Sequence, residues 1–255
     1  MPWRVSDKLE AEGRSSAVQG QYGTNNINLA TLPGLSYGRL DELVTMLNSD
    51  IAGRYLFGGS NTDKAPLPDT TTLLEGQGGR AGFKAVVTER KAADAGIDGR
   101  GRLQSSLAAG TTTVNLAEDG VHPFGMKVST VSTTSGAVTV SQPMAGGGTL
   151  GNQVGVTFAP APAEQIKAGQ TISMGFTLPD GTETQITMKA IAAADGPPGV
   201  NEFEIGADAE LTAANFKTAP DKKLVEVGGT TLAGASTFAA SQNFFNGAGR
   251  TRAAR

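Results

Sequence analysis

The chain has 255 residues and a formal charge of −3, and 38% of its residues are apolar and 18% charged. It contains no cysteine and a single histidine, which excludes disulfides, thiolate zinc sites, cysteine nucleophiles and metal sites built from several histidines. No segment approaches the roughly 18 consecutive apolar residues of a membrane-spanning helix, and the start of the chain lacks the apolar stretch of a cleaved secretory signal. We therefore expect no membrane partner.

The charges are unevenly distributed along the chain. Residues 1–107 hold 12 basic and 12 acidic side chains, whereas residues 108–249 hold 6 basic and 12 acidic ones. Three arginines follow near the end, Arg250, Arg252 and Arg255. An acidic central region repels phosphate backbones, so we expect no nucleic-acid partner.

Helical patterns dominate the first part of the chain. We expect an early helix over residues 5–18 and a break at Pro33-Gly34. A second helix should run from about Ser36 to Tyr55 and end at Gly58-Gly59, because glycine can adopt the left-handed conformation that closes a last turn. A further helix is expected from residue 80 or 81 to Ala95.

The helix expected over residues 36–55 carries an apolar row. Leu40, Val44, Leu47 and Ile51 are separated by four, three and four residues, which is the spacing of a helical seam that packs on another helix. We interpret this row as a helix-packing surface.

From about residue 111 the pattern changes to short β-segments. Threonine, valine, isoleucine and phenylalanine dominate seven stretches that are separated by glycine, proline or aspartate. These stretches are residues 111–116, 126–133, 137–141, 154–158, 171–178, 184–191 and 202–205. Strict alternation of apolar and polar residues on both sides of Pro179-Asp180-Gly181-Thr182 predicts a hairpin and hence an antiparallel sheet or sandwich.

The fold class predicted from these patterns is α+β, with N-terminal helices followed by an antiparallel, sandwich-like β-region. We divide the chain into a helical stalk and linker over residues 1–107, a β-rich outer domain over residues 108–232, and a short terminal segment over residues 233–255. A short helix is expected over residues 211–217, and the alanines of residues 236–245 favour helix there.

No sequence motif for catalysis is complete in this chain. No glycine-rich run ends in the Gly-Lys-Ser/Thr of a phosphate loop, and the glycines of residues 96–102 follow a helix rather than a strand. His122 is interpreted as a surface-loop histidine because no serine elbow accompanies it. The acidic pairs Glu118/Asp119 and Glu202/Glu204 are candidates for acid–base work, although the second pair more simply lines the wet face of a strand. We predict no catalytic residue, no metal site and no cofactor.

The segment around Arg54, Tyr55, Leu56 and Phe57 places bulky apolar side chains beside Gly58-Gly59. One interpretation is a helix that docks its last turn on its own core. The other is a joint at which the chain leaves one packed layer for another domain. Sequence patterning leaves both interpretations open.

The residues from Arg39 to Asn48, together with the run Ala52-Gly-Arg-Tyr-Leu-Phe-Gly-Gly-Ser-Asn-Thr-Asp63, resemble bacterial flagellin and, more closely, hook-associated protein type 3, which joins hook to filament. The resemblance extends more weakly through Lys84–Leu103 and through a β-region that contains Phe176-Thr-Leu-Pro-Asp-Gly181. It covers roughly residues 35–245. In that family the matched stretch ends the long N-terminal helix before the chain enters the outer domain.

The resemblance implies a structural subunit of the flagellum that acts by helix-mediated self-assembly and performs no catalysis. It implies an extracellular location after export without a cleaved signal, other flagellin or hook-associated subunits as partners, and an export chaperone. The implied assembly and joint residues are Leu40, Val44, Leu47, Ile51, Arg54, Tyr55, Leu56 and Phe57. Family members begin and end with long paired helices. The resemblance implies that the C-terminal one is missing here, so we expect a truncated or frame-disrupted chain.

Two other classes of function compete with this one. An extracellular β-sandwich binding module, for carbohydrate or surface adhesion, would use the helices as a stalk. It predicts aromatic platforms on a sheet face, yet no tryptophan or tyrosine follows Tyr55. A hydrolase with paired carboxylates would need a carboxyl group of raised pKa in a cleft.

Overall fold

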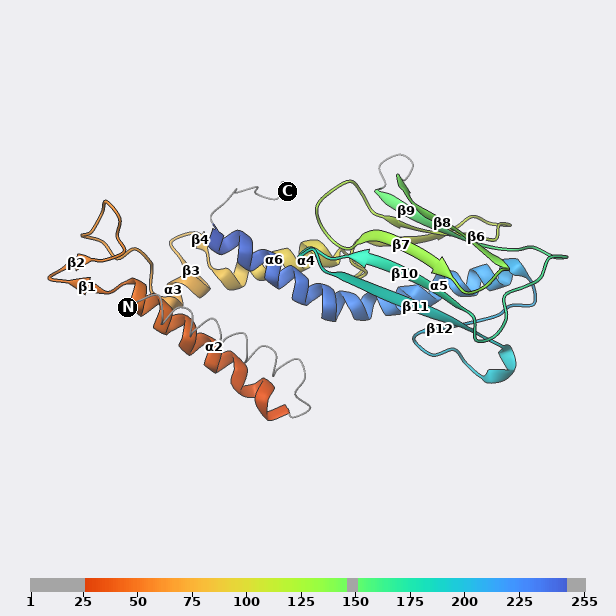
Figure 1. The fold of residues 1–255 in the computed structure, drawn as a ribbon, viewed down its shortest axis with the longest axis horizontal. Coiled ribbons are helices and arrows are strands. Elements are labelled where there is room, and N and C mark those ends of the chain that lie inside the picture. The colour runs from red at the N-terminus through yellow and green to blue at the C-terminus, as the bar shows by residue number, and fades with distance from the viewer. Residues whose placement is uncertain (1–25, 146–150, 247–255) are drawn as a thin grey trace. The chain divides into compact units, whose positions relative to one another are not determined.

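The computed structural model describes residues 26–145 and 151–246 (Figure 1), and the chain divides between residues 85 and 86 into two compact units. It contains both helices and antiparallel sheets, so the predicted α+β class is confirmed. The two units do not follow the expected ranges 1–107, 108–232 and 233–255. The helix expected over residues 5–18 and the arginine-rich end lie outside the described residues.

The first unit contains helices and two short hairpins. Its elements are α2 (Asn26–Leu47), β1 (Asp50–Ile51), β2 (Arg54–Tyr55), α3 (Thr70–Glu75), β3 (Gly76–Gln77) and β4 (Arg80–Ala81). Polar side chains tie the segment around α3 to α2: the Thr70 hydroxyl donates to Asp41 Oδ1 at 2.7 Å. The Asn48 side chain both donates to the Leu67 carbonyl and accepts from its amide, at 3.0 Å each.

Both predicted limits of the helix over residues 36–55 are wrong. Helix α2 begins at Asn26 and runs through Pro33, although a proline inside a helix removes one backbone hydrogen bond and crowds the preceding turn. It ends at Leu47 rather than at Gly58-Gly59. Asn48 is drawn out of the helix by its paired hydrogen bonds to Leu67, and the chain then turns back as the β1–β2 hairpin.

Helix α4 (Phe83–Ala95) confirms the helix expected from residue 80 or 81, although it begins slightly later. At the expected start of the helix, Arg80 and Ala81 pair instead with Gln77 and Gly76, respectively, in the β3–β4 hairpin. The helix stops before Gly96, whose φ of +73° lies in the left-handed region that glycine adopts readily.

The second unit is built on two four-stranded sheets, with strand orders β12-β11-β10-β7 and β5-β6-β9-β8. The first contains β7 (Lys127–Thr133), β10 (Thr171–Thr177), β11 (Glu183–Ile191) and β12 (Glu202–Glu204). The second contains β5 (Leu103–Leu107), β6 (Thr113–Glu118), β8 (Val138–Ala145) and β9 (Asn152–Phe158). A short 3₁₀ turn, Ala193–Asp195, precedes β12.

All seven predicted strands are present, and β10 and β11 form the predicted hairpin. Ile172 pairs with Met188 and Met174 with Ile186, and these four side chains are at most 1% exposed. Two features differ from the expectation. Strand β5 was not predicted, because its sequence Leu-Gln-Ser-Ser-Leu offers only two apolar residues, and β12 pairs with β11 in parallel.

The two sheets are joined along both of their sides. On one side the edge strands β7 and β8 meet through Gln142, whose Nε2 donates to the Val131 carbonyl at 2.8 Å. On the other side helix α5 (Ala209–Val227) contacts the edge strands β5 and β12. Its Asn215 Nδ2 donates to the Glu204 carbonyl of β12 at 3.0 Å, and its Asp221 Oδ1 accepts from Ser105 of β5 at 2.9 Å.

Three phenylalanines meet where helix α5 lies against the two sheets. Phe216 of α5 contacts Phe203 of β12 with ring centroids 5.1 Å apart and Phe158 of β9 at 5.5 Å, and all three rings meet edge to face. Each is 1% exposed. Such aromatic pairs add about 0.5–1.5 kcal/mol beyond the area that they bury. This cluster therefore connects both sheets and the helix in one core.

The helix after the sheets is much longer than the expected residues 211–217. Helix α5 continues through a π-helical turn (Gly228–Leu232) into α6 (Ala233–Asn246), so the expected helix at residues 236–245 is confirmed but no short terminal segment begins at residue 233. The buried positions are separated by four, four, three, five and three residues at Phe216, Pro220, Leu224, Val227, Leu232 and Ala235. The π-helical turn absorbs the extra residue in the step of five, and the same face stays buried.

We expect Phe216→Ala to reduce the free energy of unfolding by about 3–5 kcal/mol, because it opens a cavity among three buried rings. Phe238→Ala removes a ring that is 51% exposed on α6 and should change stability by less than about 0.5 kcal/mol. Urea denaturation followed by far-ultraviolet circular dichroism measures both. Equal losses for the two variants would contradict a central role of the cluster.

Candidate functional site

The residues of the predicted joint form a hairpin and a loop rather than the end of a helix. Strands β1 and β2 are linked by Ala52 and Gly53, whose φ angles of +52° and +78° are both positive, as a two-residue type I′ turn requires. The loop is held back on the hairpin because the Tyr55 amide donates to the Thr62 carbonyl at 2.8 Å. Arg54 Nε donates to the Thr62 hydroxyl at 3.3 Å.

Three apolar side chains of this segment are exposed. Ile51 is 66%, Leu56 57% and Phe57 44% exposed, whereas Tyr55 is half-buried and Arg54 exposed. The interpretation in which these residues dock on the core of the chain is therefore wrong for Leu56 and Phe57. We call Ile51, Leu56 and Phe57 the hairpin apolar surface.

The predicted helical seam is divided by the early end of α2. Val44 is 5% exposed, and Leu40 and Leu47 are half-buried. Helices α2 and α3 are in contact, and α3 contributes Leu73 at 9% exposure, so the buried side of this row belongs to a small core within the unit. Ile51 lies in β1 and leaves the helical row, which sequence spacing alone did not reveal.

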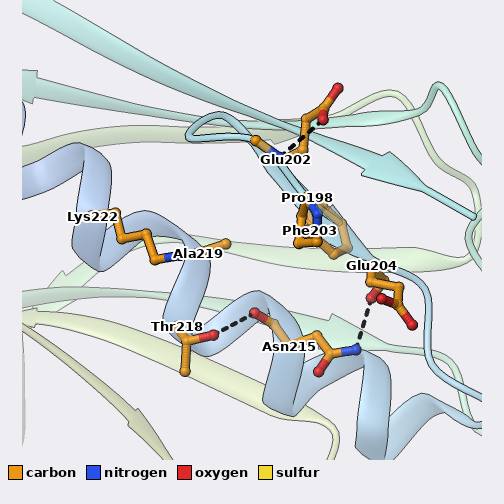
Figure 2. Close-up of a pocket in the computed structure, with 9 residues that line it drawn as sticks. Pro198, Glu202, Phe203, Glu204, Asn215, Thr218, Ala219 and Lys222 are labelled. Carbon is orange, nitrogen blue, oxygen red and sulfur yellow. Dashed lines mark hydrogen bonds between the residues drawn. The ribbon is translucent and has the colours of Figure 1, made fainter. Parts of the chain in front are cut away.

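A shallow cavity of about 130 Å³ lies between strand β12 and helix α5, as Figure 2 shows. Glu202 and Glu204, one of the two acidic pairs, line it from β12, with Phe203 buried between them. Glu202 forms an ion pair with Lys189 at 2.8 Å and accepts from the Gly199 amide at 3.1 Å.

The ion pair sets the protonation of Glu202. Hydrogen bonds from Lys189 and from the Gly199 amide lower the pKa of Glu202, and the same pair raises the pKa of Lys189. A general acid needs the opposite shift, since it must hold its proton near neutral pH. The geometry thus favours the interpretation in which this pair lines the solvent-facing side of the strand over the interpretation in which it catalyses hydrolysis.

In the other acidic pair, Glu118 and Asp119, each carboxylate binds a different set of partners. Glu118 is 4% exposed, and its two oxygens accept from the Val128 amide at 3.1 Å and from Lys127 at 3.2 Å. Asp119 instead binds Arg102 at 3.0 Å and His122 at 2.6 Å. His122 lies in the loop between β6 and β7, as expected, but it is hydrogen-bonded and its side chain is only 22% exposed. Sequence reasoning missed Arg102 as its neighbour.

Within residues 26–145 and 151–246, no cluster of three or more histidine, aspartate or glutamate side chains is arranged to hold a metal ion. None of the helices in these ranges is both long and apolar enough to cross a bilayer. The comparisons with protein-family models, with curated proteins and with solved structures yield no match to this chain.

We expect Ala52→Gly to stabilise the β1–β2 hairpin by up to about 1 kcal/mol, because an L-residue with a side chain is strained at positive φ and glycine is not. Hydrogen exchange at the Tyr55 and Leu56 amides measures the effect. The control is Ala65→Gly, at an exposed loop position with ordinary φ. It should not slow exchange at the Tyr55 and Leu56 amides and should destabilise the folded chain slightly, because glycine adds freedom to the unfolded chain. Faster exchange in Ala52→Gly would contradict the turn assignment.

We expect Lys189→Met to raise the pKa of Glu202 toward its ordinary value, because the largest cause of its lowering is lost. Since the folded-state pKa is the lower one, ionised Glu202 favours the fold above its unfolded pKa, and this contribution disappears as the pH falls through the folded value. Carboxyl NMR titration measures the shift. Lys167→Met, which breaks the separate pair with Glu164, should leave Glu202 unchanged.

Proposed function

We propose that this chain is a structural subunit of the bacterial flagellum, either a flagellin or a hook–filament junction protein, that acts by self-association and performs no catalysis. The observation that carries the proposal is the hairpin apolar surface, Ile51, Leu56 and Phe57, which lies within the segment that resembles this family. Exposed apolar side chains gathered in one segment are typical of interaction sites.

The helices on both sides of the β-region support the proposal. Helix α2 precedes the sheets, and the helical run from Ala209 to Asn246 follows them. Residues 227–249 contain no charged side chain, although Phe238 and Phe245 of this stretch are 51% and 52% exposed. A helix that exposes aromatic rings and lacks charges is suited to packing against protein rather than to facing water.

The two competing classes receive less support from the site geometry. A carbohydrate-binding module needs exposed aromatic rings on a sheet face, but Phe158, Phe176 and Phe203 of the sheets are at most 1% exposed. A paired-carboxylate hydrolase needs a carboxyl group of raised pKa, whereas the pKa of Glu202 is lowered. Self-association requires neither feature.

The proposed partners are flagellin or hook-associated subunits, with an export chaperone before secretion, and the proposed location is the extracellular flagellum. In this arrangement apolar helical surfaces of neighbouring subunits bury one another and the β-rich unit projects outward.

The proposal is tested with the double variant Ile51→Asp/Phe57→Asp. If both side chains are buried between subunits, each contributes about 1.5–3 kcal/mol, so the variant should enter filaments at least about 100-fold less efficiently. The chain is produced with an epitope tag in a flagellated bacterium, and tagged protein in sheared filaments is measured by immunoblot.

The matched control is Val121→Asp/Val200→Asp, which places the same charges at two exposed apolar positions of the β-rich unit, 86% and 50% exposed. This control should enter filaments as the parent chain does. Retention of the parent chain inside the cell, or equal incorporation of both double variants, would contradict the proposal.

A further inference from the structure

The loop between β6 and β7 holds helix α4 to the sandwich within the second unit. The Gly125 amide of this loop donates to Asp94 Oδ1 of α4 at 2.9 Å, and the Asp94 side chain is fully buried. The other oxygen of Asp94 binds Arg90 Nε at 2.6 Å. The position of α4 thus depends on a backbone amide that must stay directed at a buried carboxylate.

Arg102 forms a second connection between the same parts. Its φ of +63° is strained for a residue with a side chain, and its guanidinium donates to the Ala93 carbonyl of α4. Nη1 of the same group donates to Asp119 Oδ2 at 3.0 Å. One side chain therefore joins the last turn of α4 to the start of the loop.

His122 lies between these two connections. Its Nε2 is 2.6 Å from Asp119 Oδ1, and its Nδ1 accepts a hydrogen bond from the Phe124 amide at 3.3 Å. An amide N–H can only donate, so in this arrangement Nδ1 offers a lone pair and is unprotonated. The neutral Nε2–H tautomer satisfies both contacts, with Asp119 as the acceptor.

Protonation would change these contacts in opposite directions. A proton on Nδ1 would face the Phe124 N–H, so this hydrogen bond would be lost. The new charge would lie beside Arg102, whose Nη1 is 3.5 Å from Nε2, and near Arg90, whose guanidinium lies over the Phe124 ring at 5.2 Å. Asp119 would still attract the ring, whereas Asp94 is occupied by Arg90 and Gly125, and Glu118 is occupied by Lys127 and Val128.

We propose that His122 is a pH-dependent switch that controls how firmly the β6–β7 loop holds helix α4. In its neutral form the ring fixes Phe124 and thereby aims the next amide, that of Gly125, at Asp94. In its protonated form the ring stays with Asp119 and releases Phe124, so the hold on Asp94 weakens. This proposal does not depend on the flagellar function, and histidine is the side chain whose charge ordinarily changes between pH 5 and 8.

The test is hydrogen exchange at the Phe124 and Gly125 amides of the full chain, compared as protection factors at pH 8 and pH 5, where ordinary aspartates stay ionised. Loss of the two hydrogen bonds should lower protection by roughly fivefold to tenfold or more at pH 5. The amides of the β10–β11 hairpin serve as internal controls and should keep their protection. Unchanged protection at Phe124 and Gly125 would overturn the proposal.

His122→Asn is the matched variant, because its side-chain oxygen can accept from the Phe124 amide and does not titrate. It should keep the same protection at both pH values, and a fall equal to that of the parent chain would also overturn the proposal. The ¹⁵N shifts of the imidazole give an independent measurement on the unmodified chain, where His122 is the single histidine. They should report the Nε2–H tautomer at pH 8, and an Nδ1–H tautomer would refute the mechanism.

Discussion

The contact of Phe216 with Phe158 and Phe203 is the interaction on which the second unit depends. Two four-stranded sheets leave a side open between β5 and β12, and α5 is the element that covers it. The three rings bring one residue from each sheet and one from the helix into a single buried cluster, while Asn215 and Asp221 satisfy polar groups of the two edge strands. On the opposite side Gln142 supplies hydrogen bonds to Val131 that a paired strand would otherwise supply. Exposed strand edges invite unwanted pairing, and in this unit a helix and one amide side chain cover them.

The first unit differs from the second because it buries few apolar side chains and exposes several. Its buried apolar residues are few, with Val44 of α2 and Leu73 of α3 below 10% exposure, and polar contacts such as Thr70 with Asp41 hold the helices together. The hairpin apolar surface remains in water even though the turn at Ala52-Gly53 and the bond from Tyr55 to Thr62 define its backbone well. An ordered segment that exposes isoleucine, leucine and phenylalanine is costly for an isolated chain. The self-association that we propose would bury these side chains.

Much of the fold could be predicted from the sequence where the apolar pattern was regular. The alternation of Ile172, Met174 and Phe176 placed β10 and its hairpin correctly, because burial of one sheet face dictates a period of two. Errors arose where a single side chain or a packing contact overrides local propensity: Asn48 ends α2 by binding Leu67, and packing on the sheets carries α5 past Pro220. In the candidate site, the sequence pattern identified Ile51, Leu56 and Phe57 as candidate residues, but it did not predict that their side chains are exposed. Arg102 contacts Asp119 and His122, which lie 17 and 20 positions further along the chain. No local sequence motif predicts contacts over such separations.

The π-helical turn has a consequence for the stretch that follows it. Gly228 lies so close to Gly99 that a side chain there would overlap the Gly99 carbonyl oxygen, so the turn is wedged against the loop after α4. Each residue of an α-helix advances the direction of its side chain by about 100°. Deleting one residue of this turn would therefore rotate α6 by about that angle relative to α5, and the faces carrying Ala235 and Ala239 would turn away from their present surroundings. The π-helical turn thus keeps the buried positions of α5 and α6 on one face of a continuous helix, and the length of the turn determines which residues of α6 are covered.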